Sequence, residues 1–202
     1  KAVICSKYGS PEVLQIQNVA KPTPNDDQIL IKIVATAINS GDARLRSLDV
    51  KWFMKIILRL VFGISKPRKP ILGNVFSGVV ESIGDKVSKF KVGDKVFGST
   101  GFKFGTYAEY IAVKQNSNVI EMPKNATYDE AAAIVFGGQT AIYFLEKTKL
   151  TEKLNPKILI IGATGSVGVA AIQIAKHYKD VITAVCSTRG FELVKSFKVP
   201  NI

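Results

Sequence analysis

The residues with the clearest chemistry form a glycine-rich turn at 163–168, between two apolar runs. The turn carries Ala163, Gly165 and Gly168 in the G-x-G-x-x-G spacing of dinucleotide-binding proteins, with alanine in the first place. A strand, a tight turn and a helix in succession leave backbone N–H groups and the positive end of a helix free to bind a pyrophosphate. Glycine turns also join elements that bind nothing, but the next apolar run, 181–186, completes a βαβ unit of the expected size. The predicted pyrophosphate ligands are Ala163, Thr164, Gly165, Ser166, Val167 and Gly168.

The residues after the second apolar run indicate which dinucleotide is bound. In an NAD site an acidic residue about twenty positions after the first glycine accepts hydrogen bonds from the ribose hydroxyls. Here that place holds Ser187, Thr188 and Arg189, without a carboxylate. Two hydroxyls and a planar, charged guanidinium suit a 2′-phosphate. We therefore predict NADP(H) as the cofactor; the alternative is that Arg189 only begins a solvated helix.

The elements that must position this turn belong to the second of two patterns in the chain. After residue 120, helices alternate with strands that suit a parallel sheet. Thr127 and Glu130 form a capping box that opens a helix through Phe136, Gly137 and Gly138 interrupt it, and it resumes over 141–147. Another helix is expected over 191–198. We predict a cofactor-binding domain over 121–202.

Before residue 120 the sequence predicts short strands separated by glycines. The expected strands are 28–38, 75–83, 95–97 and 107–113. Many short strands separated by glycines are typical of a small, strongly bent β-barrel-like domain, predicted over 1–120.

Composition excludes several classes of protein. The chain has 202 residues, 47% of them hydrophobic, and a formal net charge of +12. Its lysines are scattered among apolar strands, so we read the charge as surface chemistry and attraction of an anionic cofactor, and we expect no nucleic-acid partner. Cys5 and Cys186 lie far apart in strand-like runs, which suggests neither a disulfide framework nor a metal cluster and fits a reducing cytoplasm.

The longest apolar stretch, residues 52–62, is too short to span a bilayer and contains two charges. Its apolar residues recur at helical spacing, so it predicts an amphipathic helix. We expect this helix to pack on the protein's own core or over a pocket. The alternative is a membrane surface held by Lys51, Lys55, Arg59 and Lys66.

Six segments in order carry a family resemblance. They are INSGD at 38–42, ILGNVFSGVV at 71–80, VGDKVF at 92–97, GTYAEY at 105–110, AAA at 131–133 with Thr140-Ala141, and the glycine turn. In this order the chain resembles the medium-chain dehydrogenase/reductase superfamily, and within it the zinc-independent quinone oxidoreductases, the zeta-crystallin-like reductases. The resemblance implies an α/β plus β fold: an N-terminal GroES-like bent β-barrel domain followed by the first part of a Rossmann doubly wound parallel sheet.

The zinc ligands of related alcohol dehydrogenases are missing. Those enzymes place a cysteine where this chain has Asn39 and a histidine-glutamate pair where it has Asn74 and Val75. The segment 98–105 lacks the cysteines of a structural zinc lobe, and His177 is the only histidine. We expect no bound metal. Hydride transfer to a quinone or a conjugated enone is then favoured, because alcohol oxidation would need something to lower the hydroxyl pKa.

The resemblance also assigns roles near the substrate. Asn39 and Asp42 would line the pocket as the catalytic pair, with Asn39 donating a hydrogen bond to the acceptor oxygen. Asp42 is alternatively a structural turn residue. Arg44 stands where relatives often carry a tyrosine, which either favours a more polar or anionic substrate or is a surface change. Thr140 resembles a residue near the nicotinamide, or its hydroxyl bonds its own helix.

The sequence supplies only part of a dinucleotide fold, because two βαβαβ halves are needed and one is incomplete. We therefore expect a fragment of a longer protein or a truncated product, whose parent is a homodimer by resemblance. Two functions stand: an NADPH-dependent, zinc-independent quinone or enone oxidoreductase, or a non-catalytic module that binds cofactor or a partner.

Overall fold

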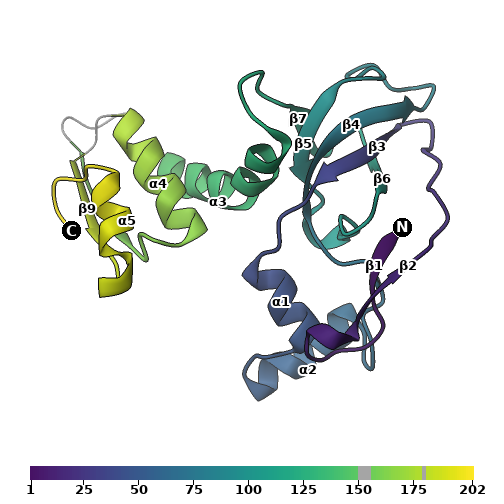
Figure 1. The fold of residues 1–202 in the computed structure, drawn as a ribbon, viewed down its shortest axis with the longest axis horizontal. Helices are drawn as coiled ribbons and strands as arrows, with labels where there is room; N and C mark the ends of the chain where they lie inside the picture. The colour runs from purple at the N-terminus through teal and green to yellow at the C-terminus, as the bar shows by residue number, and fades with distance from the viewer. Residues whose placement is uncertain (150–155, 179–180) are drawn as a thin grey trace. The chain divides into compact units, whose positions relative to one another are not determined.

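The computed structural model describes residues 1–149, 156–178 and 181–202. The chain divides into two compact units, Lys1–Ala133 and Ile134–Ile202 (Figure 1). Helix α3 (Tyr128–Lys147) begins in the first unit and ends in the second. The predicted domain boundary at residue 120 stays a prediction.

A bent antiparallel sheet forms the centre of the first unit. Its strands, in spatial order, are β6 (Tyr110–Lys114), β3 (Gln28–Ala35), β4 (Val75–Ile83), β5 (Lys95–Ser99) and β7 (Asn118–Glu121). Two register shifts in the pairing of β3 with β4 bend the sheet, as bulges do. Alternate residues such as Ile29 and Ile31 face inward and pack with Phe76 and Val80. The predicted bent β domain is confirmed.

A second cluster of this unit lies under the remaining short elements. Strand β1 (Ala2–Cys5) pairs with β2 (Leu14–Gln17), separated by the 3-10 helix η1 (Pro11–Val13). Helices α1 (Ser40–Ser47) and α2 (Trp52–Phe62) and the 3-10 helix η2 (Gly101–Lys103) complete the unit. The buried residues that pack together in this second cluster are Cys5, Val13, Leu45, Leu72 and Phe104.

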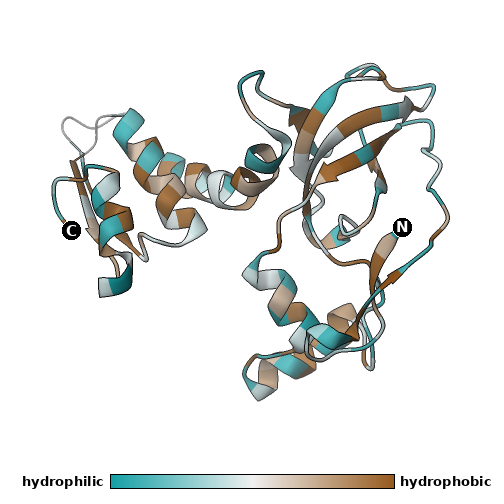
Figure 2. Ribbon diagram, in the orientation of Figure 1, coloured by the Kyte–Doolittle hydropathy of each residue, from teal (hydrophilic) through white to brown (hydrophobic). Residues whose placement is uncertain are grey.

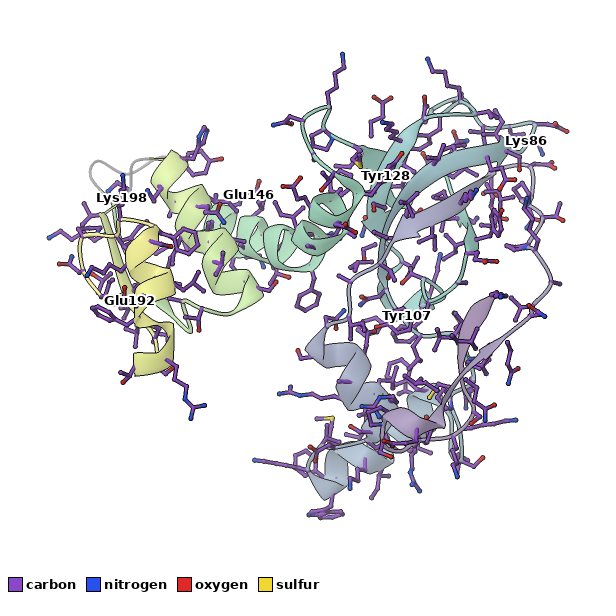
Figure 3. All side chains as sticks on the ribbon, viewed as in Figure 1. Lys86, Tyr107, Tyr128, Glu146, Glu192 and Lys198 are labelled. Carbon is purple, nitrogen blue, oxygen red and sulfur yellow. The ribbon has the colours of Figure 1, made fainter. Side chains whose placement is uncertain are left out.

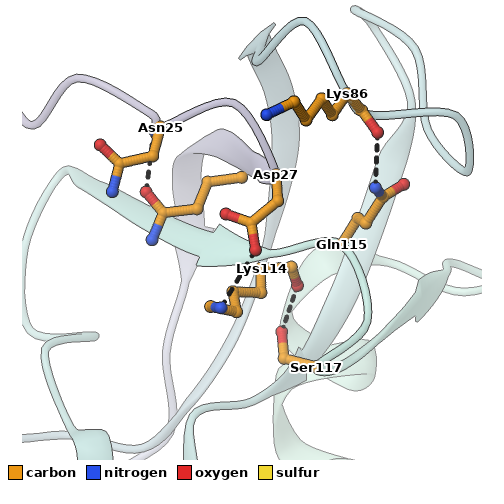
Figure 4. A network of polar contacts seen from close by, with 7 residues as sticks. Asn25, Asp27, Lys86, Lys114, Gln115 and Ser117 are labelled. Carbon is orange, nitrogen blue, oxygen red and sulfur yellow. Dashed lines mark hydrogen bonds and ion pairs between the residues drawn. The ribbon is translucent and has the colours of Figure 1, made fainter.

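Polar contacts fix the ends of the sheet strands. Asp27, just before β3, forms an ion pair with Lys114 at the end of β6, 3.1 Å apart (Figure 4). The amide of Gln115 donates to the carbonyl of Lys86 at 2.8 Å, and Ser117 donates to the carbonyl of Lys114 at 2.6 Å. These exposed contacts contribute little energy each, and of the three the Asp27–Lys114 pair joins the end of β6 to the start of β3.

The second unit is a βαβ unit with a short helix after it. Strand β8 (Lys157–Ile161), helix α4 (Ser166–His177) and strand β9 (Val181–Val185) follow one another, and β8 pairs with β9 in parallel. The 3-10 helix η4 (Thr188–Gly190) leads into α5 (Phe191–Ser196). Ile160, Ile172, Ile182 and Val194 form the buried core. The predicted βαβ unit is confirmed.

Several element boundaries differ from the sequence predictions. Strand β3, predicted over 28–38, ends at Ala35, ahead of the cap of α1, and β6, predicted over 107–113, begins only at Tyr110. The break predicted at Gly137-Gly138 is wrong, because α3 is continuous through both glycines. The last helix ends at Ser196, and Lys198 adopts a left-handed backbone conformation with φ of 53°.

Within the described residues, none of the helices combines the length and apolarity needed to cross a membrane. Cys5 and Cys186 are both unpaired. The cytoplasmic location stays a prediction.

Candidate active site and cofactor turn

The predicted pair Asn39 and Asp42 forms the cap of α1. The Asn39 side-chain oxygen accepts hydrogen bonds from the backbone N–H groups of Gly41 and Asp42, at 2.8 and 3.2 Å. In return, Asp42 Oδ2 accepts from the backbone N–H of Asn39 at 3.2 Å. This reciprocal arrangement is a capping box, which stabilises the helix start. Asp42 therefore has the structural turn role that the sequence left open.

Two further polar side chains, Asn74 and Tyr107, complete the cluster (Tyr107 is labelled in Figure 3). The amide nitrogen of Asn39 donates to Asn74 Oδ1 at 2.8 Å, and the Tyr107 hydroxyl donates to Asp42 Oδ2 at 2.9 Å. Gly73 makes this approach possible, because a Cβ there would lie 2.4 Å from the Tyr107 ring. We name Asn39, Asp42, Asn74 and Tyr107 the capping cluster. Sequence reasoning assigned no role to Tyr107, although it lies in a quoted motif.

The electrostatics of the capping cluster depend on burial. Asp42 is only 4% exposed, and burial raises the pKa of its carboxyl, while bonds from Asn39 and Tyr107 act in the opposite direction. The backbone N–H of Gly73 also lowers the pKa of the Asp42 carboxyl. The other carboxylate oxygen, Asp42 Oδ1, has no hydrogen-bond partner among the described residues. Burial and the neighbouring carboxylate raise the pKa of Tyr107 strongly. Tyr107 is therefore a protonated donor at neutral pH.

Arg44 lies outside the capping cluster. It is exposed on α1, two residues from Asp42, and residues two apart on a helix do not face each other. In the part of the chain that the structure describes, its guanidinium has no polar partner. A role for Arg44 in substrate binding stays a prediction.

The glycine turn has the geometry of an anion-binding helix start. Gly162 has φ of +77°, and Gly162 and Ala163 donate to the carbonyl of Val185, which ties the turn to β9. Gly165 caps α4 without a side chain, so the N–H groups of Ser166, Val167 and Gly168 have no intrahelical acceptor and no side-chain cap. Those N–H groups and the helix end suit a pyrophosphate.

The third glycine of the fingerprint is required by close packing. A Cβ on Gly168 would lie 2.3 Å from the carbonyl oxygen of Gly162 and 2.8 Å from the Cα of Ala163. Only glycine allows α4 to pass this close to the end of β8.

The segment after β9 lies against the glycine turn. A Cβ on Gly190 would lie 2.2 Å from Thr164 Cγ2, so η4 is in contact with the turn. Ser187 caps η4, and Ser187, Thr188 and Arg189 are all exposed. The structure thus brings both predicted groups of cofactor ligands together. Gly190 was not predicted from the sequence, because its contact with Thr164 is long-range.

Thr140 lies in α3, where its hydroxyl donates to the carbonyl of Phe136 at 2.7 Å. This is the bond to its own helix that the sequence left open. A position beside a nicotinamide stays a prediction.

For metal binding, no group of three or more His, Cys, Asp or Glu side chains that could hold an ion occurs among residues 1–149, 156–178 and 181–202. Asn39 and Asn74, which stand at two of the zinc-ligand positions inferred from the resemblance, bond to each other.

Comparison with known proteins relates both units to one group. Residues 25–124 match the alcohol dehydrogenase GroES-like domain family. The chain is 36% identical over 206 residues to the 2-methylene-furan-3-one reductase of Solanum lycopersicum, covering 97% of this chain and 50% of that protein. It is 35% identical over 193 residues to the quinone oxidoreductase of Homo sapiens, covering 93% of this chain and 53% of that protein.

The fold agrees with a solved structure. The crystal structure of the Escherichia coli quinone oxidoreductase complexed with NADPH superposes with a TM-score of 0.81 at 25% identity, over 99% of this chain and 57% of that one. The chain spans about half the length of the curated relatives it matches.

Proposed function

We propose, because this chain belongs to the medium-chain dehydrogenase/reductase superfamily, that the natural protein carrying it is an NADPH-dependent reductase of quinones or conjugated enones that needs no zinc. The observation that carries the proposal is the start of α4, where the N–H groups of Ser166, Val167 and Gly168 lack intrahelical acceptors and the preceding turn contacts η4. The names of the relatives support the acceptor class. A 2-methylene-furan-3-one is a ketone conjugated to a carbon–carbon double bond, and the human relative is named for quinones.

The second unit fits a nicotinamide dinucleotide. The bound cofactor would supply a hydride. The N–H groups of Ala163 and Gly165 already donate to the carbonyls of Val185 and Gly162, so those of Ser166, Val167 and Gly168 would hold the pyrophosphate. Ser187, Thr188 and Arg189 would bind the 2′-phosphate, where a carboxylate would repel it. The NADPH complex of the Escherichia coli neighbour supports this choice of cofactor.

The capping cluster would serve the acceptor. The Asn39 amide has two N–H groups, and one bonds Asn74, so the second remains to donate to a carbonyl oxygen on which negative charge develops. Asp42 holds the backbone of Asn39, and Tyr107 holds Asp42. Asp42 and Tyr107 are thus positioning residues for Asn39. By the resemblance, Arg44 would contact the substrate and Thr140 would lie near the nicotinamide.

This arrangement suits reduction better than alcohol oxidation. Quinones and enones accept hydride into a conjugated π-system, and one hydrogen-bond donor then stabilises the resulting oxyanion. Removing hydride from an alcohol requires its hydroxyl to lose a proton, which a metal usually assists. The alternative function is a module that binds cofactor and turns over nothing.

The test uses the natural protein with NADPH, a benzoquinone and a conjugated enone, with and without a chelator. We expect acceptor-dependent NADPH oxidation that the chelator leaves unchanged. Asn39→Ala should lower turnover by roughly ten- to a hundredfold, as for other single oxyanion donors, while Ala at the exposed Asn18 has no effect. Activity that only zinc restores would overturn the metal-free mechanism, and NADPH binding without any turnover would favour the alternative.

A further inference from the structure

Helix α2 presents an apolar face to solvent. All of its residues are apolar except Lys55 and Arg59 (Figure 2). None of them is fully buried. The exposed fraction is 75% for Trp52, 62% for Leu60 and 51% for Ile56. Among the described residues, only the inner edge of this helix packs on the protein's own core; the alternative expectation, packing over a pocket, stays a prediction.

The arrangement around the helix is the reverse of that in an ordinary surface helix. At 100° per residue, the half-buried Leu58 and Phe62 lie on one side. The residues that spread over the opposite half are Trp52, Phe53, Ile56, Ile57, Leu60 and Val61, all of them exposed. Arg59 lies at one rim of this half, and Lys55 lies between Arg59 and Phe62 around the helix. A surface helix would normally turn its charges outward and its apolar residues inward.

The inner edge holds α2 firmly. The Phe62 ring contacts Phe104 and Phe102, with centroids 5.7 and 6.1 Å apart, and Phe102 is itself 82% exposed. At the C-terminal end, the backbone N–H of Arg68 donates to the carbonyl of Phe62 at 2.7 Å, and the Arg68 guanidinium donates to the carbonyl of Leu60 at 3.2 Å. Helix α2 is thus held in place within the first unit, with its apolar face exposed.

The segment that carries this face is basic, beginning directly after Asp49. Residues 50–80 contain no Asp or Glu, and their basic residues are Lys51, Lys55, Arg59, Lys66, Arg68 and Lys69. Among the described residues, none of these cations forms an ion pair with a carboxylate. Unpaired cations beside an apolar face complement a surface that is anionic at its headgroups and apolar beneath them.

We propose that α2 is an interfacial helix that attaches the protein to anionic lipid bilayers. The helix would lie in the plane of the interface, with Leu60 and Ile56 toward the acyl chains, Trp52 at headgroup level and the cations on phosphates. A second copy of the chain is the competing occupant. It is less favoured, because two such faces would bring their unpaired cations together.

The test measures co-sedimentation of the natural protein with vesicles of phosphatidylcholine alone or with about 30% phosphatidylserine. We expect binding to the anionic vesicles at least about tenfold stronger than to neutral ones, and weaker at about 0.5 M than at about 0.05 M salt. The double variant Ile56→Glu, Leu60→Glu should lose at least about tenfold in binding. Ile120→Glu is the matched control, because Ile120 is 61% exposed on β7, and it should bind as the natural protein does.

All variants change exposed residues, so their unfolding temperatures should match that of the natural protein, and a melting curve checks this. Absence of binding to anionic vesicles overturns the proposal, as does equal loss in both variants. The proposal is also overturned if the natural protein does not bind vesicles but dimerises with rising concentration, and the α2 double variant abolishes that dimerisation. This result would assign the face to a second copy of the chain. None of these outcomes depends on reductase activity.

Discussion

At the scale of single residues, the Tyr107–Asp42 hydrogen bond lends itself to a stability measurement. Tyr107→Phe should lower the free energy of unfolding at neutral pH by about 1.5–3 kcal/mol, because a buried carboxylate loses a charge-assisted bond. The Tyr107 bond favours the charged carboxyl, so its contribution is present at neutral pH and declines as pH falls through the folded pKa of Asp42. Chemical denaturation at neutral pH and near pH 4 would show a smaller loss at the acidic value.

Tyr8→Phe is the control for this measurement. The Tyr8 hydroxyl donates to the neutral carbonyl of Gly63 at 2.8 Å, so its removal should cost about 0.5–1.5 kcal/mol equally at both pH values. A Tyr107→Phe loss that does not change with pH would contradict an ionised Asp42 at neutral pH.

Arg189 belongs to the same scale. Arg189→Ala should weaken NADPH binding to the natural protein about tenfold, the loss expected for one charge-assisted contact, and leave NADH binding unchanged. Arg44→Ala removes the same charge from the exposed surface of α1 and should alter neither affinity. Equal affinities of the unmodified protein for NADPH and NADH would contradict the assignment of the 2′-phosphate to this segment.

At the scale of elements, local signals in the sequence predicted the structure well. The capping box of α3 is present, with Glu130 accepting from the backbone N–H of Thr127 at 2.8 Å, and the helix at 52–62 and the strand at 75–83 have the predicted bounds. The partners of the candidate site were harder to predict. Asn74 and Tyr107 lie 35 and 65 positions from the residues they bond, and only the folded sheet brings them together.

The continuity of α3 through two glycines has the same long-range origin. Local propensity disfavours glycine in a helix and predicts a break there. In the structure, however, a Cβ on Gly137 would lie 2.3 Å from Ser166 Oγ and 2.5 Å from the Ser166 carbonyl oxygen. Glycine at 137 thus allows α3 to approach the first residue of α4, a contact that no local pattern reveals.

This contact gives an element-scale prediction. Gly137→Ala should lower the free energy of unfolding by about 1–3 kcal/mol, because the overlap with the Ser166 backbone exceeds the gain in helix propensity. It should also weaken NADPH binding by displacing Ser166. Gly138→Ala is the matched control, since its Cβ meets only the flexible side chain of Ile134 at 3.1 Å, and it should be near neutral. Thermal melts of the two variants measure this difference in stability. Equal stabilities of the Gly137→Ala and Gly138→Ala variants would contradict the close approach of α3 to α4.

At the scale of the whole molecule, hydrophobic burial is divided between the two units. Two buried clusters, around Phe76 and around Leu72, consist of residues from Lys1–Ala133. The third, around Ile172 and Ile182, consists of residues from Ile134–Ile202. Each unit thus has its own core, which is the usual basis for separate cooperative unfolding.

Separate cores predict that the cofactor protects one unit selectively. NADPH at about a hundred times its Kd stabilises the unit that binds it by about 2.7 kcal/mol, which slows hydrogen exchange through unfolding of that unit about a hundredfold. Mass spectrometry should therefore show protection in peptides from 157–178 and 181–190. Peptides from the β1–β2 pair should exchange at unchanged rates, because that pair lies in the first unit. Equal protection in both sets would show that the units unfold together, and protection confined to the first unit would remove the glycine turn as the cofactor site.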